Sequence, residues 1–265
     1  MTTHPAAFPA GTPAWADITV PDVDLARAFY GPLLGWEFEV GGPETGGYVQ
    51  ATLDGRRVVG MAEPMGEDPA PPSAWCVYLA TDDVTATTAA VEGAGGRSLV
   101  TAMPILDMGV MAIYVDVTGA VFGAWQPGTH TGWDAVDEPG SVVWSEVMTH
   151  DQQAALDFYQ RVYGYRAEDM SGPGFVYATV SVDGQTVAGV GQYGSQAGPD
   201  APAAWTLYFG VDDADVSASR VAELGGTVVS PPTHTAYGRM ALVQGPFGEV
   251  FALMGPDSDE LAAQG

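Results

Sequence analysis

The chain has 265 residues, 46% of them hydrophobic, which is enough to build the core of one large domain or of two smaller ones. Acidic residues outnumber basic ones by 33 to 8, and every basic residue is an arginine, which excludes Schiff-base chemistry on a lysine. The net charge of −25 excludes binding to a nucleic-acid backbone, disfavours anionic membrane surfaces and would steer a cationic ligand inward.

Targeting and redox signals are absent from the sequence. The single cysteine, Cys76, permits no internal disulfide, and the first residues lack the basic and apolar regions of a signal peptide. No apolar run reaches the roughly 18 residues of a membrane span. We therefore expect a cytoplasmic protein that binds neither nucleic acid nor membrane.

The first elements follow an order that recurs along the chain. Residues 15–20 alternate in polarity as a β-strand does, and Asp22 is a plausible helix cap. Large apolar residues then recur at helical spacing over 25–33, before Gly35 ends the helix. Three strand-like segments and a proline-rich break follow, and then the same order returns. The later segments are strands at 36–40, 47–53 and 57–62, then a strand at 75–80, a helix at 83–93 and strands near 97–100, 109–116 and 120–126.

The whole pattern repeats at the 129-residue spacing that separates Trp15 from Trp144. Phe29-Tyr30 returns as Phe158-Tyr159, and Gly119-Ala-Val-Phe122 returns as Gly248-Glu-Val-Phe251. The sequence therefore predicts an α+β protein of four βαβββ modules arranged as two pairs. The expected divisions are a flexible N-terminus at 1–13, a first domain at 14–127, a linker at 128–141, a second domain at 142–256 and an acidic tail at 257–265.

These motifs resemble those of the vicinal oxygen chelate superfamily. The first motif is a strand, a D-x-x-x-A-x-x-F-Y helix, a glycine and an aromatic residue, and it occurs in 15–36 and again in 144–165. The second is the closing segment of the first copy, Gly119–Pro127. The superfamily groups glyoxalases, extradiol dioxygenases and bleomycin-type resistance proteins. The closest resemblance is to tandem glyoxalase-like proteins of actinobacteria. It implies that each pair of modules curls a mixed sheet into a cup, with the ligand inside and helices outside.

Strand alternation predicts which side chains face the cups. A carboxylate at the same strand position in both copies is the sharpest feature, and we assign a catalytic role to it and to one tyrosine in each cup: Asp17 and Tyr78 in the first, and Glu146 and Tyr208 in the second. The predicted ligand-binding residues are Trp15, Thr19, Cys76, Trp125, Trp144, Met148, Thr206 and Met254. Structural roles remain open for all of them: hydrogen-bonded acids, tyrosine walls and ordinary core tryptophans.

The resemblance also implies where metal-dependent members place their three ligands. Aligned by the flanking motifs, these positions hold Asp17, Cys76 and Gly123 in the first copy, and Glu146, Thr206 and Ala252 in the second. Neither set supplies three suitable donors, so we expect no metal and no other cofactor. The histidines offer no replacement, since His130, for example, lies in the linker as a loop residue.

Three functions are compatible with the sequence. The first is a metal-independent binding protein for a planar aromatic, possibly cationic natural product, acting in drug sequestration or presentation as bleomycin-resistance relatives do. The second is a metal-independent tailoring enzyme of secondary metabolism, an isomerase, cyclase or lyase that uses a cup carboxylate as general base. The third is a metal-dependent glyoxalase, lyase or dioxygenase. One cup could be purely structural, and we expect a monomer with its domains paired internally.

Overall fold

The computed structural model describes residues 6–64, 66, 72–195 and 197–257. In these residues four α-helices accompany two eight-stranded mixed sheets, which confirms the α+β class and the four βαβββ modules in two pairs. Part of the expected N-terminus, residues 1–5, and the tail beyond residue 257 lie outside the described residues. None of the described helices is long and apolar enough to cross a membrane.

The first sheet contains two modules joined at its centre. Its strands run in the order β2-β3-β4-β1-β5-β8-β7-β6, with β1 parallel to β4 and antiparallel to β5. The modules therefore meet along the β1–β5 pair. The elements are β1 (Pro13–Thr19), α1 (Val23–Leu34), β2 (Glu37–Val40), a short 3₁₀ helix (Pro43–Thr45), β3 (Val49–Leu53), β4 (Arg56–Ala62), β5 (Trp75–Ala80), α2 (Val84–Gly93), β6 (Arg97–Ile105), β7 (Gly109–Val115) and β8 (Val121–Pro127).

The second sheet repeats the topology of the first. Its strand order is β10-β11-β12-β9-β13-β16-β15-β14, so β9 and β13 form the central antiparallel pair. The elements are β9 (Val142–Thr149), α3 (Gln152–Tyr163), β10 (Arg166–Asp169), β11 (Val176–Val182), β12 (Gln185–Gln192), β13 (Ala204–Gly210), α4 (Ala214–Glu223), β14 (Thr227–Thr235), β15 (Gly238–Gln244) and β16 (Val250–Gly255).

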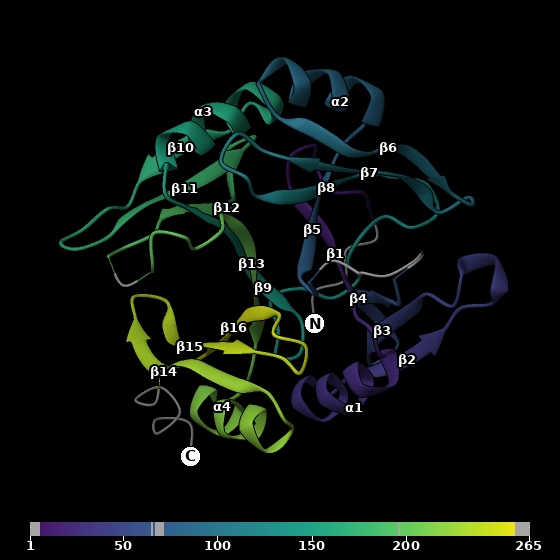
Figure 1. Cartoon of the computed structure of the whole chain (residues 1–265), viewed down its shortest axis with the longest axis vertical. Coiled ribbons are helices and arrows are strands. Elements are labelled where there is room, and N and C mark those ends of the chain that lie inside the picture. Colours follow the sequence, from purple (N-terminus) through teal and green to yellow (C-terminus); the bar gives the residue numbers. More distant parts are fainter. Residues whose placement is uncertain (1–5, 65, 67–71, 196, 258–265) are drawn as a thin grey trace.

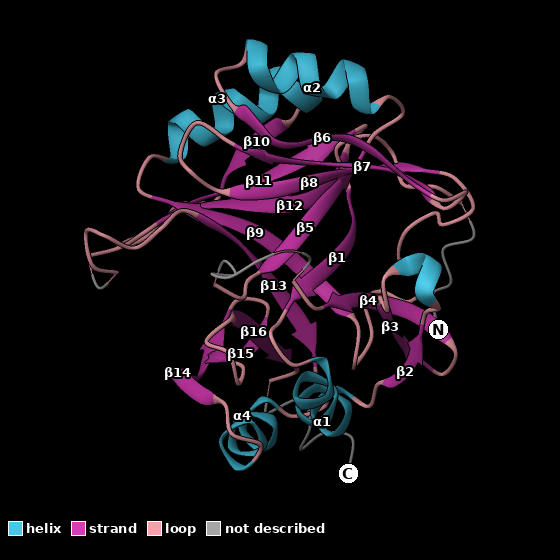
Figure 2. Cartoon of the chain, turned by 45° about the vertical axis from the view of Figure 1, so that its right-hand side comes forward, coloured by secondary structure: helices cyan, strands magenta, loops and turns pink. Residues whose placement is uncertain are grey.

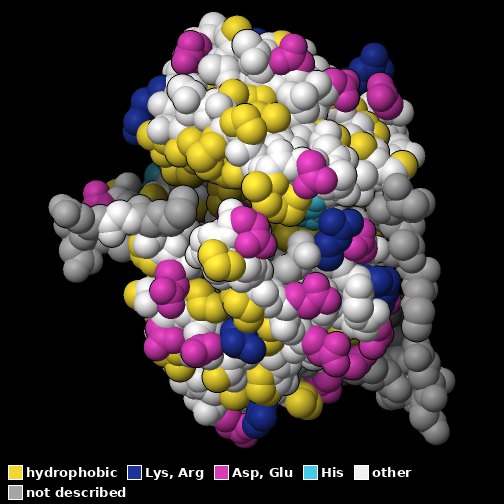
Figure 3. Space-filling view, turned by 90° about the vertical axis from the view of Figure 1, so that its right-hand side faces the viewer, with side chains coloured by type: hydrophobic (Ala, Val, Ile, Leu, Met, Phe, Trp, Pro, Cys, Tyr) yellow, Lys and Arg dark blue, Asp and Glu magenta, His cyan; other side chains and the backbone are white. Residues whose placement is uncertain are grey.

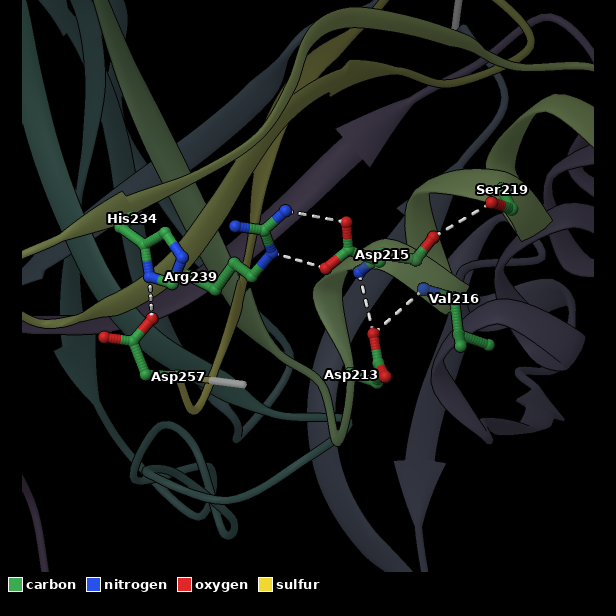
Figure 4. A network of polar contacts seen from close by, with 7 residues as sticks. All are labelled: Asp213, Asp215, Val216, Ser219, His234, Arg239 and Asp257. Carbon is green, nitrogen blue, oxygen red and sulfur yellow. Dashed lines mark hydrogen bonds and ion pairs between the residues drawn. The ribbon is translucent and has the colours of Figure 1, made fainter. Parts of the chain in front are cut away.

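Each α-helix begins at an aspartate whose carboxylate accepts backbone N–H groups of the first turn. The predicted role of Asp22 as the cap of the first helix is thus confirmed. At α4 the carboxylate of Asp213 accepts from the N–H groups of Asp215 and Val216, and Arg239 of β15 pairs with the Asp215 carboxylate. Figure 4 shows this two-contact ion pair between Arg239 and Asp215, which links the start of α4 to the neighbouring strand β15.

The two halves pack with the outer faces of their sheets toward each other. The central strands β5 and β13 are in contact, α1 lies beside α4 at one end of the molecule, and α2 lies beside α3 at the other. Figures 1 and 2 show the helix pairs closing the two ends, while the inner faces of the two curled sheets open in opposite directions.

Buried polar contacts cross between the halves at related positions. The Tyr30 hydroxyl donates to the Glu249 carboxylate at 2.7 Å, and Tyr159, 129 residues later, donates to Asp116 at 3.0 Å and accepts from the Trp205 indole N–H at 2.8 Å. These groups lie within a buried aromatic cluster drawn from both halves. Because the contacts repeat with the duplication, the halves are related by an approximate twofold arrangement. The cluster contains Phe29, Trp36, Trp75, Phe122, Phe158, Phe209 and Phe251.

The segment between the two sheets, residues 128–141, packs against the first sheet. Arg56 and Arg57 of β4 pair with Glu138 and Asp134 in this segment. Trp133 is buried, and its backbone N–H donates to the carbonyl of Ala14. We call residues 128–134 the strap. The expected domain bounds on either side of it stay a prediction.

Tyr159 gives a direct test of the contacts between the halves. Tyr159→Phe should lower the free energy of unfolding by about 1–3 kcal/mol, because the buried groups of Asp116 and Trp205 lose their shared partner. The measurement is urea denaturation followed by tryptophan fluorescence.

The matched control is Tyr163→Phe, since the Tyr163 hydroxyl is buried and has no hydrogen-bond partner among the described residues. This change should alter the free energy of unfolding by less than about 0.5 kcal/mol. Equal losses in the two variants would contradict the assigned role of the Tyr159 hydroxyl.

Candidate functional site

A carboxylate held by tyrosines lies on the inner face of the first sheet. Asp17 of β1 is directly opposite Cys76 of β5 in the strand register. The Tyr78 hydroxyl donates to the Asp17 carboxylate at 3.1 and 3.2 Å from its two oxygens, and the Tyr48 hydroxyl lies 3.5 Å from one of them. The Trp15 indole N–H in turn donates to Tyr48 at 3.1 Å.

Two glycines make room for these tyrosine rings. A Cβ at Gly60 would lie 1.6 Å from the Tyr48 hydroxyl oxygen, and a Cβ at Gly123 would lie 2.2 Å from Cδ1 of Tyr78. Gly60 is opposite Asp17 in β4, and Gly123 is opposite Tyr78 in β8. The absence of side chains at these positions therefore allows both rings to lie flat against the sheet beside Asp17.

The second sheet carries the same cluster with tighter geometry. The two oxygens of Glu146 accept separate hydrogen bonds, from Tyr177 and from Tyr208, each at 2.7 Å. The Trp144 indole N–H donates to Tyr177 at 3.0 Å. Glu146 is only 8% exposed, whereas Asp17 is half-buried.

The structure thus brings together the predicted residues Asp17, Tyr78, Trp15 and Cys76 in one cup, and Glu146, Tyr208 and Trp144 in the other. Thr206 is opposite Glu146 in the strand register. The other predicted ligand-binding residues lie farther along their strands. Thr19 is exposed at the end of β1, Met148 and Met254 are half-buried, and Trp125 is buried beneath the strap. Their roles in binding stay predictions.

Tyr48 and Tyr177 are the residues that the sequence reasoning missed. They come from β-hairpins whose exact register the hydrophobic pattern left undefined. The signal was present, since Tyr48 and Tyr177 are separated by the same 129 residues as Trp15 and Trp144, as are Gly60 and Gly189. A Cβ at Gly189 would lie 1.9 Å from the Tyr177 hydroxyl oxygen, as at Gly60 for Tyr48.

His130 lies in the loop between the sheets, as expected, but the structure buries its side chain, which the sequence did not predict. Its side chain is 6% exposed and packs edge-to-face on Trp15, with ring centroids 4.4 Å apart, and its carbonyl accepts from the Trp125 indole N–H at 2.8 Å. The Arg57 guanidinium group lies 2.9 Å from His130 Nδ1 and also donates to the Asp134 carboxylate. The strap therefore covers the Trp15 end of the first cup.

Burial governs the proton affinities in the cups. Desolvation raises the pKa of Asp17 from 3.8 to about 7, against the opposing hydrogen bonds from Tyr78 and Tyr48. Desolvation also raises the pKa of Glu146 and, together with the Asp17 charge, that of the Cys76 thiol. The pKa of His130 falls to about 4 because of burial and of Arg57, so the imidazole is neutral at pH 7. Asp17 thus exchanges its proton near neutral pH.

The residues at the family's metal-ligand positions do not fit a three-ligand metal. Asp17 and Cys76 are adjacent, but Gly123 offers no donor, and the Tyr78 ring fills the space that a side chain at position 123 would enter. In the second cup, the partners of the Glu146 carboxylate within the described part of the chain are tyrosine hydroxyls, not an imidazole or a second carboxylate. Among the described residues, no group of three or more His, Cys, Asp or Glu side chains is placed to hold an ion.

The space around the clusters differs between the halves. Figure 3 looks onto the first half and shows a hollow walled by hydrophobic side chains between its upper and lower parts. A hollow of about 300 Å³ between the halves adjoins Trp144 and is also lined by Phe8 and Trp133, and one of about 270 Å³ in the second half is lined by Phe175 and Tyr193. Glu146 lines neither of these two hollows.

The raised pKa of Asp17 predicts a pH-dependent stability. Between about pH 4 and pH 7 the unfolded chain releases this proton while the folded chain retains it, so stability falls as pH rises through this window. Asp17→Asn removes this dependence. The variant should match the wild type near pH 4 and exceed it near pH 8 by up to ~4 kcal/mol.

The measurement is the difference in free energy of unfolding between the two proteins from pH 4 to pH 8. Taking the difference cancels the titration of the other acidic residues. A difference that does not change with pH would contradict the raised pKa.

Comparisons with known proteins agree with this architecture. The structure superposes on a Mn(II)-bound glyoxalase from Novosphingobium aromaticivorans with a TM-score of 0.65 and 18% identity, covering 95% of this chain and 85% of that one. The 2,3-dioxygenase LapB from Pseudomonas sp. KL28 gives a TM-score of 0.65 at 13% identity, covering 95% and 94%. At these identities the likeness shows the fold alone.

Relatives found by sequence comparison share a higher identity with this chain than those solved structures do. Anthracycline biosynthesis protein DnrV of Streptomyces peucetius is 35% identical over 260 residues, covering 93% of this chain and 94% of that protein. Putative glyoxylase CFP32 of Mycobacterium bovis is 35% identical over 251 residues, covering 93% and 95%. The family model described as Glyoxalase/Bleomycin resistance protein/Dioxygenase superfamily matches residues 12–123 and 129–253. The chain belongs to this superfamily.

Proposed function

We propose that this protein binds a planar aromatic small molecule bearing an amino group, without using a metal, and that a cup carboxylate accepts the amino group. One observation carries the proposal: a desolvated carboxylate lies among tyrosine and tryptophan side chains, at a position to which the family resemblance assigns a metal ligand. A flat apolar ligand suits the aromatic walls, and a cation suits the carboxylate.

Two further observations support this ligand class. The net charge of −25 raises the local concentration of cations near the protein. The similarity to anthracycline biosynthesis proteins links the chain to relatives named for a planar aromatic product class. Sequestration or presentation of such a molecule requires binding alone and no chemical step.

Doxorubicin is a suitable probe because this anthracycline has a planar hydroxyquinone ring system and a protonated amino group. It should bind saturably, as measured by calorimetry and by the anisotropy of its own fluorescence. N-acetyldoxorubicin keeps the rings and loses the charge, so it should bind at least tenfold more weakly. Dialysis against EDTA should leave the affinity unchanged. Absence of doxorubicin binding, or loss of binding after EDTA, would overturn the proposal.

The affinity for doxorubicin should also depend on pH. Only the ionised carboxylate attracts the amino group, and Asp17 is ionised above about pH 7. As pH falls from 7 to 5, the affinity should decrease by nearly tenfold per unit, because the carboxylate must first release its proton. The affinity for N-acetyldoxorubicin should stay constant over the same range. Parallel pH profiles for the two compounds would contradict a carboxylate anchor.

A second candidate function is favoured by the proton affinity of Asp17. A general base works best when its pKa is near the working pH, and about 7 is such a value. The Asp17 carboxylate would take a proton from an activated C–H group, and the Tyr78 hydroxyl would donate a hydrogen bond to the enolate oxygen that forms. This chemistry is that of an isomerase or a cyclase.

Anthrone, a planar tricyclic ketone with an acidic methylene group, tests this candidate. In deuterated buffer the wild type should accelerate deuterium incorporation into anthrone, as followed by mass spectrometry. Asp17→Asn should abolish the acceleration and leave anthrone binding within about twofold, since the neutral ligand makes no ion pair. A wild-type exchange rate equal to that of buffer would remove this candidate.

A further inference from the structure

We infer that the two cups are not equivalent: the first cup, around Asp17, takes the ligand, and the second, around Glu146, is closed by its own tyrosines and serves the fold. This inference rests on the proposed function and names which of two similar sites performs it. It predicts one ligand for each chain, although the sequence repeats the whole site.

The hydrogen bonds to the two carboxylates differ in length. Each oxygen of Glu146 accepts its own tyrosine hydroxyl at 2.7 Å, a short contact typical of a carboxylate acceptor. At Asp17 the single Tyr78 hydroxyl is shared between both oxygens at 3.1 and 3.2 Å, and Tyr48 is at 3.5 Å. The tyrosines therefore hold the Asp17 carboxylate less closely than the Glu146 carboxylate, so Asp17 exchanges a tyrosine contact for a ligand more readily.

The difference follows from one methylene group. The tyrosines occupy matching positions in the two sheets, and each tyrosine of the hairpin strand lies over a glycine. The longer side chain of Glu146 brings its oxygens to 2.7 Å from both hydroxyls, while the shorter side chain of Asp17 leaves its contacts at 3.1–3.5 Å. Two tyrosines thus hold the carboxylate closely in the second half and more loosely in the first.

Accessibility differs in the same direction. Glu146 is 8% exposed, while Asp17 and its register partner Cys76 are only half-buried and Thr19 beyond them is exposed. A third tyrosine, Tyr193, lies within electrostatic reach of Glu146, and its counterpart 129 residues earlier is Pro64. The face of the first half also carries a hollow walled by hydrophobic side chains (Figure 3).

The strap gives the first cup a defined end. Buried His130 lies against Trp15 and Trp125, and Arg57 fixes it together with Asp134. At the positions of Arg56 and Arg57 the second half has Gln185 and Thr186, which cannot form these ion pairs. A flat ligand in the first cup would therefore be bounded by the strap at one end and held by Asp17 farther along β1.

The single cysteine allows each cup to be tested separately. Cys76 is opposite Asp17, and Thr206 is opposite Glu146 in the same register. Wild type thus carries its only thiol in the first cup, and the double variant Cys76→Thr with Thr206→Cys carries it in the second. The rate of modification by N-ethylmaleimide at about pH 8.5, followed by intact-mass spectrometry, is measured with and without saturating doxorubicin.

Doxorubicin should slow modification of the wild-type thiol at least tenfold and that of the thiol introduced by Thr206→Cys less than twofold, with a calorimetric stoichiometry of one. Protection of both thiols, protection of the second alone, or a stoichiometry of two would overturn the inference and leave the proposed function standing. Absence of doxorubicin binding to either protein would instead overturn the proposed function.

Asp17→Glu provides a second readout that does not depend on labelling. The added methylene lets the carboxylate reach Tyr48 and Tyr78, as Glu146 reaches its own partners, so doxorubicin affinity should fall at least tenfold. Circular dichroism and thermal unfolding verify that the variant is folded. Unchanged affinity in the folded variant would refute the argument from side-chain length.

Discussion

The packing of the two halves against each other is the constraint on which the rest of this structure depends. Neither curled sheet is covered on its outer face by its own helices alone, and aromatic side chains of both halves form one core. Because the hydrogen bonds of Tyr30 and Tyr159 are buried in that core, the sheets are held in a fixed relation. The carboxylates Asp17 and Glu146 lie on the inner faces, away from this interface.

Most of the fold could be predicted from the sequence because the same pattern of elements occurs twice along the chain. A period-two pattern at 15–20 alone is weak evidence, but its return at 144–149 with the same helix, glycine and aromatic residue makes the module order specific. The extent of β6 was underestimated, since it continues to Ile105 through residues that do not alternate in polarity. Register shifts within the β6–β7 pair explain why alternation failed there.

The candidate site could be predicted only in part. Alternation placed Asp17, Tyr78, Glu146 and Tyr208 on the inner faces because the central strands have regular register there. The lengths of the hydrogen bonds, which separate the two carboxylates, depend on tenths of an ångström that no pattern encodes. The burial of His130 depends on the path of the strap, which is held by the ion pair between Asp134 and Arg57 and not set by any local periodicity.

The opposite directions of the two cups also bear on how a molecule could pass through this protein. The shared aromatic core lies between the inner faces, so a compound leaving one cup would enter bulk solvent before it could meet the other (Figure 1). Within the residues that the structure describes, the duplication therefore leaves the two cups without a shared channel through which an intermediate could pass. Any sequence of steps that involves both halves would have to proceed through the free pool of the compound.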